Sequence, residues 1–399
     1  MFSRNFNILL SGVFIKSFGN GIYAIGGMLL VFLLTNDPLY SGITFFLVNI
    51  PSALGFLISP LANLVNYKVA LFTCELVKAV LLASIPLLFF FDALHVFLLM
   101  FIMFIVSAIS QFTYPIDSTL VPNIVGGENV VKANSVVNMI RESMDIIFLG
   151  IAGVIISVAG SAIALLITAI CHFIVAVVYL FFKDINFNET VEKTTGKMSY
   201  NLKRYTQDLR EGFTCVKDTV LIHISISASM ANFFVGVMLA SLPAFSLIHG
   251  GTEAFYGYYM MAMMLGFLIG SLVVNKLSRF KMGTLTIVCF SLSSLSWMGA
   301  SVLPVWFSII SYGVGFISLS IINILFFSVI QQKIPSNLIG RVITVVTSGA
   351  AICMPLGGML GGLIASQFVP AYAMFIGGGG FCSFRYIGCY TKDYATYIQ

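Results

Sequence analysis

The stretch LVPNIVGGENVVKANSVV, residues 120–137, has a counterpart in KIPSNLIGRVITVVTSG, residues 333–349. Pro122 and Pro335 lie 213 residues apart, and each ends a predicted helix just before a short basic loop. Self-similarity at such a distance indicates that one structural unit occurs twice in a chain. The sequence therefore predicts two halves of the same architecture.

The composition of the chain indicates whether these two halves lie in water or in a membrane. The chain has 399 residues and a mean hydropathy of +1.02, with 59% hydrophobic and only 9% charged residues, whereas soluble domains carry about a quarter charged residues. About 20 apolar residues cross a bilayer as a helix. Twelve spans are predicted, at approximately 8–34, 41–65, 69–91, 96–121, 134–158, 161–182, 219–248, 254–275, 283–303, 306–330, 342–366 and 369–388. The fold class is an all-α integral membrane protein.

A long polar stretch, residues 183–217, divides these spans into two sets of six. We expect an N-terminal six-helix bundle at 1–182, a cytoplasmic linker at 183–217 and a C-terminal six-helix bundle at 218–399. Two such pseudo-repeats around a central cavity are typical of transporters. If the N-terminus is inside, 17 of the 20 Lys and Arg residues fall on cytoplasmic segments. Because basic residues accumulate on that side, both termini are predicted to be cytoplasmic.

Three stretches carry a family resemblance: PLANLVNYKVALFTCELVKAVLLA (60–83), PIDSTLVPNIVGGENVVKANSVVNMI (115–140) and QQKIPSNLIGRVITVVTSGAAICMPLGGMLGGLIA (331–365). Their order and spacing resemble the major facilitator superfamily, and within it the bacterial branch of macrolide-efflux proteins and siderophore exporters. The resemblance implies twelve transmembrane helices in a bacterial cytoplasmic membrane.

Two positions depart from the family pattern. The loop after the second span usually reads G-x-L-x-D-R, but here Asn66 replaces the acid and the loop is shortened to Lys68. The buried arginine that often occurs in the fourth span is replaced by Val106. Neither family role can be transferred to these residues.

The fifth span carries charge where an apolar helix is expected. Arg141 and Asp145 are four residues apart, so they share one helical face with Asn138. Glu142 points along an adjacent face, about 100° further round. Charges inside a membrane are costly and mark functional sites.

The first span carries a second polar stripe, formed by Lys16, Asn20 and Tyr23 at i, i+4 and i+7. We expect these residues and the charged face of the fifth span to form a proton-coupling site. In this hypothesis Lys16 and Arg141 adjust the pKa of the Glu142 and Asp145 carboxylates so that these can bind and release a proton. Burial raises a carboxylate pKa, and a nearby cation lowers it. The alternative is that the paired charges only staple the first and fifth spans together.

The second half offers neutral polar groups among apolar residues. Asn232, Tyr256 and Asn323 are expected on a wall that contacts a lipophilic substrate. A cytoplasmic gate is expected from residues near the inner ends of the spans, which resemble the ion-pair latches of the family. The gate residues are Asn66, Lys68, Glu75, Lys78, Asp117, Lys132 and Arg341.

These observations predict a proton-coupled secondary transporter that exports an amphipathic small molecule, such as a drug, a macrolide-like compound or a siderophore. An importer of a small metabolite and a non-transporting membrane sensor or assembly protein are the alternatives. The chain is not expected to be an enzyme, since it contains no HExxH, GxSxG or P-loop motif. No cofactor or metal is expected, and transport is expected to be driven by a proton gradient. The expected partners are membrane lipids and a small-molecule substrate, without nucleic acid, and the chain is expected to be a monomer.

Overall fold

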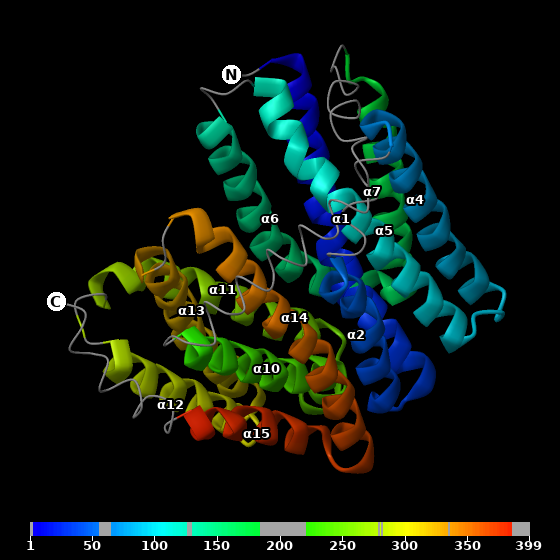
Figure 1. The fold of residues 1–399 in the computed structure, drawn as a ribbon. Helices are drawn as coiled ribbons and strands as arrows, with labels where there is room; N and C mark the ends of the chain where they lie inside the picture. The colour runs from blue at the N-terminus through cyan, green and yellow to red at the C-terminus, as the bar shows by residue number, and fades with distance from the viewer. Residues whose placement is uncertain are drawn as a thin grey trace. The chain divides into compact units, whose positions relative to one another are not determined.

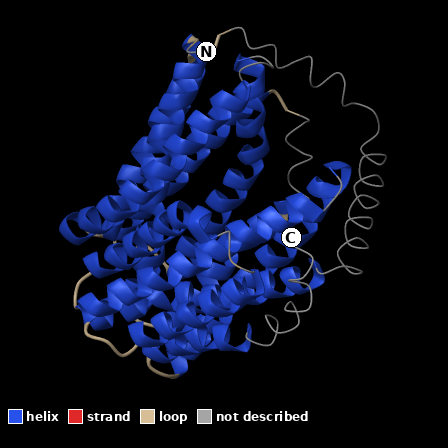
Figure 2. Ribbon diagram, turned by 90° about the vertical axis from the view of Figure 1, so that its left-hand side faces the viewer, coloured by secondary structure: helices blue, strands red, loops and turns tan. Residues whose placement is uncertain are grey.

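The computed structural model describes residues 3–55, 65–125, 130–183, 221–277, 280, 282–333 and 336–384. Figure 2 shows that these residues form helices joined by short loops, and no strand occurs among them. Helix α1 begins after Ser3, whose hydroxyl accepts a hydrogen bond from the Phe6 N–H at 3.2 Å. This N-cap satisfies one of the N–H groups that a helix start leaves without a partner.

Among the described residues, the first half contributes six α-helices (Figure 1). They are α1 (Arg4–Thr35), α2 (Pro38–Ala53), α4 (Tyr67–Phe90), α5 (Val96–Val125), α6 (Val130–Ala159) and α7 (Ser161–Leu180). The second half contributes α10 (Leu221–Gly250), α11 (Ala254–Leu277), α12 (Met282–Ala300), α13 (Val305–Lys333), α14 (Ser336–Gln367) and α15 (Pro370–Gly380), followed by the short 3-10 helix η3 (Phe381–Phe384). Within the described residues, nine helices are long and apolar enough to cross a membrane. Each of the twelve predicted spans overlaps one of the described helices, and α2 and α15 cover only part of the spans predicted at 41–65 and 369–388.

The helix contacts repeat in the two halves. In the first half α1 packs on α5, α6 and α7, and α7 also packs on α4. In the second half α10 packs on α13, α14 and α15, and α15 also packs on α12. These are the same contacts when α1, α4, α5, α6 and α7 are matched with α10, α12, α13, α14 and α15. The predicted duplication is therefore present in the packing.

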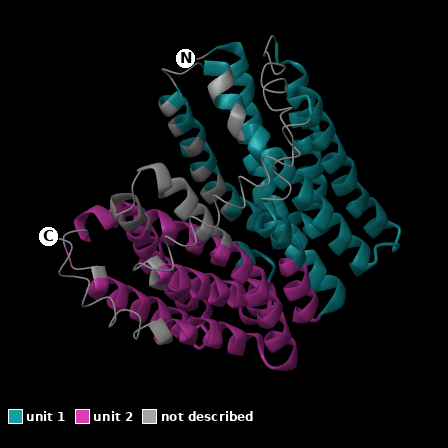
Figure 3. Ribbon diagram, in the orientation of Figure 1, with its two compact units in different colours: residues 1–36, 47–197, 252–257 teal, residues 37–46, 198–251, 258–399 magenta. Residues whose placement is uncertain are grey.

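The chain divides into two compact units, drawn in two colours in Figure 3. Unit 1 comprises residues 1–36, 47–197 and 252–257, and unit 2 comprises 37–46, 198–251 and 258–399. The linker expected at 183–217 lies outside the described residues except for Lys183.

The end of the second half differs from the predicted span at 369–388. Helix α15 has 11 residues, and its last four are the glycines Gly377–Gly380. A Cβ at Gly378 would lie 2.8 Å from the Met298 nitrogen on α12. The glycines thus allow α15 to approach its neighbours closely, as small residues do between membrane helices. Residues 385–399 lie outside the described part.

Candidate functional site

Five ionisable side chains from four helices of unit 1 meet around the carboxylate of Glu75 on α4. Lys78, one turn further along α4, places Nζ 2.7 Å from Glu75 Oε1. Lys16 on α1 places Nζ 3.1 Å from the same oxygen. His172 on α7 places Nδ1 2.6 Å from Oε2. Both oxygens of Glu75 therefore have charged or polar partners.

Lys16 connects Glu75 to a second carboxylate. Its Nζ donates to Asp117 Oδ2 on α5 at 2.7 Å. The other oxygen of Asp117, Oδ1, is buried and has no hydrogen-bond partner among the described residues. Lys16 thus bridges two acids, and one acceptor position of Asp117 is left unused. We call Lys16, Glu75, Lys78, Asp117 and His172 the buried ion-pair cluster.

The two ends of this cluster differ in exposure. The side chains of Glu75 and Lys78 are 0% and 1% exposed, whereas those of Lys16 and Asp117 are 14% and 19% exposed. Lys16 and Asp117 therefore form the more exposed end of the cluster. The pair of Glu75 and Lys78 forms its dry interior.

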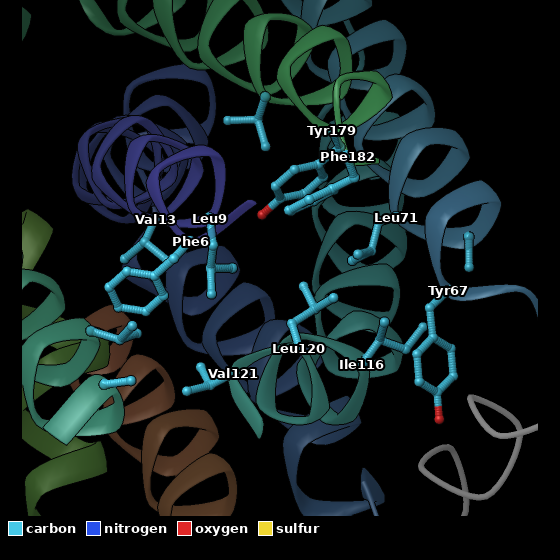
Figure 4. Close-up of a cluster of buried hydrophobic side chains, with 14 residues drawn as sticks. Phe6, Leu9, Val13, Tyr67, Leu71, Ile116, Leu120, Val121, Tyr179 and Phe182 are labelled. Carbon is cyan, nitrogen blue, oxygen red and sulfur yellow. The ribbon is translucent and has the colours of Figure 1, made fainter. Parts of the chain in front are cut away.

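A hydrophobic layer adjoins the cluster. On α1 and α4, the residues of this layer come before the charged residues in the sequence. On α7, they come after His172, toward the C-terminal end of the helix. Figure 4 shows Tyr179 from α7, and Phe182 just after this helix, close to Leu9 and Leu71, and the two aromatic rings stack with centroids 5.4 Å apart. The other labelled members are Phe6, Val13, Tyr67, Ile116, Leu120 and Val121. This layer places the charges inside the bundle, away from the end where α1 and α4 begin.

The local sequence explains the geometry. Residues three apart on a helix share a face, so Glu75 and Lys78 pair along α4. The Lys16 ammonium also lies 5.9 Å from the centre of the Tyr179 ring, close enough for an attractive cation–π contact. With a neutral imidazole at His172, two cations balance two anions. Such balance matters because breaking a buried ion pair costs about 3–5 kcal/mol.

The structure groups the predicted residues differently from the sequence analysis. Among the described side chains, Lys16 forms ion pairs with Glu75 and Asp117, which were expected at the gate. The side chains of Asn138, Glu142 and Asp145 lie outside the described residues, so their coupling role stays a prediction.

The other described residues of the first-span and fifth-span group, Asn20, Tyr23 and Arg141, do not belong to the buried ion-pair cluster. Asn20 on α1 is exposed. Tyr23 donates its hydroxyl to the Met103 carbonyl on α5 at 3.1 Å, which fixes α1 against α5. Arg141 is half-buried on α6.

The predicted gate residues outside the cluster have separate positions. Asn66 is the N-cap of α4, and its side chain accepts from the Lys68 and Val69 N–H groups. Lys68 Nζ donates to the Phe182 carbonyl at 2.8 Å, just after α7 ends. Lys132 is exposed, and the side chain of Arg341 lies outside the described residues. Asn66 therefore has a helix-capping contact where the family pattern places an acid.

The residues of the predicted substrate wall are described one by one, and their shared role stays a prediction. Asn232 donates to the Ala228 carbonyl of its own helix at 2.9 Å. Tyr256 is buried and Asn323 is exposed. An open groove of about 430 Å³ lies between α10 and Cys353 of α14. It is lined by Ser225, Ile226, Ser229, Met230, Phe233, Phe234 and Cys353.

Sequence reasoning missed His172. It lies in the middle of α7, is buried, and contacts Glu75. A signal was available, because an ionisable residue inside a 20-residue apolar segment is by default a functional candidate. The partner, 97 residues away in the chain, could not be found in that way.

Two six-helix halves with matching internal contacts define a membrane transporter built from a repeat. The sequence model of the Major Facilitator Superfamily matches residues 1–358, and the chain belongs to this superfamily. It is therefore a membrane-spanning secondary transporter.

Relatives and solved structures agree with this assignment. The uncharacterized MFS-type transporter YvqJ of Bacillus subtilis (strain 168) is 22% identical over 95% of this chain and 90% of YvqJ. The crystal structure of the nucleoside transporter NupG has a TM-score of 0.74 and 15% identity, and the match covers 100% of both chains. A bacterial homologue of the iron transporter ferroportin, in an inward-facing state, has a TM-score of 0.73 and 13% identity, over 98% and 99% of the two chains. At these identities the solved structures show the shared fold.

Proposed function

We propose that the protein exchanges protons for an amphipathic small molecule and that the buried ion-pair cluster couples the two fluxes. The observation that supports this proposal is the position of Lys16 between two carboxylates, 2.7 Å from Asp117 and 3.1 Å from Glu75. Ionisable residues inside membrane helices commonly form proton relays.

Asp117 is the proposed site of proton exchange. Its Oδ1 is buried without a hydrogen-bond partner among the described residues, and its side chain lies at the exposed end of the cluster. A proton that binds there removes the charge that attracts Lys16 to α5. Lys16 then retains Glu75 on α4 as its anionic partner. Protonation thereby weakens the link from α1 to α5 and favours the link from α1 to α4, which provides two discrete arrangements for a transport cycle.

The substrate class is proposed from the groove on α10. Its volume of about 430 Å³ lies in the range of small-molecule sites, about 300–1,000 Å³. Phe233, Phe234 and Met230 supply apolar and adaptable contacts, whereas Ser225 and Ser229 supply hydroxyls. This lining suits a largely apolar molecule with few polar groups. The half-buried thiol of Cys353 lies in the same lining, so bound substrate should slow its alkylation by a small maleimide.

Coupling is tested with purified protein in proteoliposomes that carry an imposed pH gradient. In the Asp117→Asn variant, a lipophilic drug should equilibrate without accumulating, because the carboxylate that binds the proton is absent. The matched control is Asp92→Asn, which removes the same charge from the loop between α4 and α5. The alternative, a structural staple, predicts that Asp117→Asn lowers thermal stability and retains gradient-driven accumulation. Glu142→Gln and Asp145→Asn test the remaining predicted carboxylates in the same assay.

Export across a bacterial cytoplasmic membrane, with both termini in the cytoplasm, is the proposed direction. The direction rests on the resemblance to exporters alone, whereas the cytoplasmic position of the termini rests on the distribution of basic residues. Drug susceptibility of a deletion strain, with and without a proton uncoupler, tests it. Uptake of a small metabolite into cells that express the chain, with unchanged drug susceptibility, would instead support the importer alternative.

A further inference from the structure

A second cavity lies wholly within unit 1, at the end where α1 and α4 terminate and α7 begins. Its volume is about 270 Å³. Its walls come from the last turns of α1 and α4, the turn between α6 and α7, and the turn before α11. The lining residues are Leu30, Leu33, Leu34, Phe89, Phe90, Ala159, Gly160, Ser161, Ala162, Ile163 and Glu253. We call it the Glu253 cavity.

The carboxylate of Glu253 is held at this cavity by Ser161. The Ser161 hydroxyl donates to Glu253 Oε2 at 3.2 Å, and Ser161 is the first residue of α7. The preceding residue, Gly160, has φ +82° and provides no side-chain cap for that helix. Glu253 therefore places a negative charge at the positive end of the α7 dipole, which is a favourable position.

This interaction leaves the charge of Glu253 only partly compensated. Among the lining residues, which come from α1, α4, α6, α7 and the turn before α11, Glu253 is the one titratable side chain. Burial raises the pKa of Glu253, because it disfavours the ionised form more than the Ser161 hydrogen bond stabilises that form. The cavity therefore contains an anion that would gain from a cationic partner.

The remaining walls suit the apolar part of such a partner. Leu30, Leu33 and Leu34 form an aliphatic side, and Phe89 and Phe90 add two aromatic rings with centroids 6.3 Å apart. Aromatic rings also attract ammonium groups by the cation–π effect. A carboxylate, two rings and an aliphatic wall in one small cavity are complementary to an ammonium group on a compact apolar body.

We propose that the Glu253 cavity binds an organic ammonium compound with a small apolar body, its ammonium group against the Glu253 carboxylate and its body against the leucines and phenylalanines. The ammonium group can belong to a free amine or to an amine-bearing lipid headgroup. This site uses none of the buried ion-pair cluster residues and none of the groove on α10, so it is independent of the proposed coupling and substrate sites.

The test uses the full chain in a non-ionic maltoside detergent, with phenethylammonium and its neutral analogue 2-phenylethanol as probes for calorimetry. The wild type should bind phenethylammonium at least tenfold more tightly than the neutral analogue. This preference should diminish as the pH is lowered and Glu253 is protonated. Glu253→Gln should abolish it. The matched control Asp92→Asn removes an acid from the same end of unit 1 and should change affinity less than twofold; Asp92 has φ +53°, which asparagine tolerates.

A second variant keeps the proposal testable if Glu253→Gln does not fold. Leu33→Trp fills the cavity and leaves the carboxylate in place, and it should weaken phenethylammonium binding at least tenfold. Competition by added phosphatidylethanolamine but not by phosphatidylglycerol would identify a lipid headgroup as an occupant, and competition by neither lipid would identify free amines. Equal affinity for the charged and neutral probes, or equal losses in Glu253→Gln and Asp92→Asn, would refute the proposal.

Discussion

His172 on α7 and Glu75 on α4 lie 2.6 Å apart, Nδ1 to Oε2, and both side chains are buried inside unit 1. An ionised carboxylate only accepts hydrogen bonds, so Nδ1 of His172 carries the proton and donates it. Glu75 thereby links α7 to Lys16 on α1 as well as to Lys78 on its own helix. One carboxylate thus joins three helices of the unit.

Separate replacement of Glu75 and Lys78 should be far more damaging than their joint replacement. Glu75→Gln leaves Lys78 without its carboxylate, and Lys78→Met leaves a buried negative charge less compensated. Each single change should lower the free energy of unfolding by about 3–5 kcal/mol, whereas replacing a buried pair together is often nearly neutral. Lys16 keeps Asp117 in the double variant, so the charge balance is restored. Unfolding in mixed detergent compares the wild type, the two single variants and the double variant. A loss of unfolding free energy in the double variant that equals the sum of the two single losses would contradict the paired geometry.

Two replacements of His172 should distinguish the contribution of its hydrogen bond to stability from the contribution of its packing. His172→Leu removes the donor to Glu75 and should cost about 1.5–3 kcal/mol, the usual value for a hydrogen bond to a charged group. His172→Asn can place an amide N–H near the position of Nδ1 and should cost less. The same unfolding measurement compares the two variants. If both lose equal stability, packing rather than hydrogen bonding explains the role of His172.

The helices could be predicted from the sequence, because their length and hydropathy are local properties. All twelve predicted spans overlap described helices, and even the charged fifth span lies within one continuous helix, α6. The pair of Glu75 and Lys78 was accessible in the same way, since a spacing of three residues places both on one face.

The partners of Lys16 could not be predicted in this way. Asp117 is 101 residues away in the chain, and helical periodicity does not determine which neighbouring helix a face meets. The sequence analysis therefore assigned Lys16 to the fifth span and Asp117 to the gate. The contact of α1 with α5 is what brings Lys16 to Asp117. The packing of α1 on α7 depends on details such as Gly12, where a Cβ would lie 2.7 Å from the Tyr179 ring.

Glu253 should make the stability of the protein decrease as the pH rises. Burial raises its pKa in the folded state above the value of the unfolded chain, about 4.3. Between these two values the folded state binds more protons, so the free energy of unfolding falls with increasing pH. Glu253→Gln should flatten this part of the stability curve. The effect should be modest because Glu253 is partly exposed. Melting temperatures of both proteins from pH 4 to pH 7 test the prediction, and parallel curves would contradict it.

Gly357 on α14 should be intolerant even of alanine. A Cβ at this position would overlap the Phe233 carbonyl of α10 and lie 2.7 Å from its carbon atom. Backbone atoms cannot move away as a flexible side chain can, so Gly357→Ala should destabilise the protein by about 1–3 kcal/mol. Phe233 also lines the groove on α10, so displacement of its backbone should weaken protection of Cys353 by substrate.

Gly349 on the same helix provides the matched control for Gly357. A Cβ there would meet only the Ser229 hydroxyl, at an ordinary contact distance of 3.5 Å. Because alanine favours a helix over glycine by about 1 kcal/mol, Gly349→Ala should be neutral or stabilising. Both variants have the same change in composition and helix propensity, so their difference in melting temperature isolates the approach of α14 to α10. Equal melting temperatures would show that the two helices do not require this close crossing.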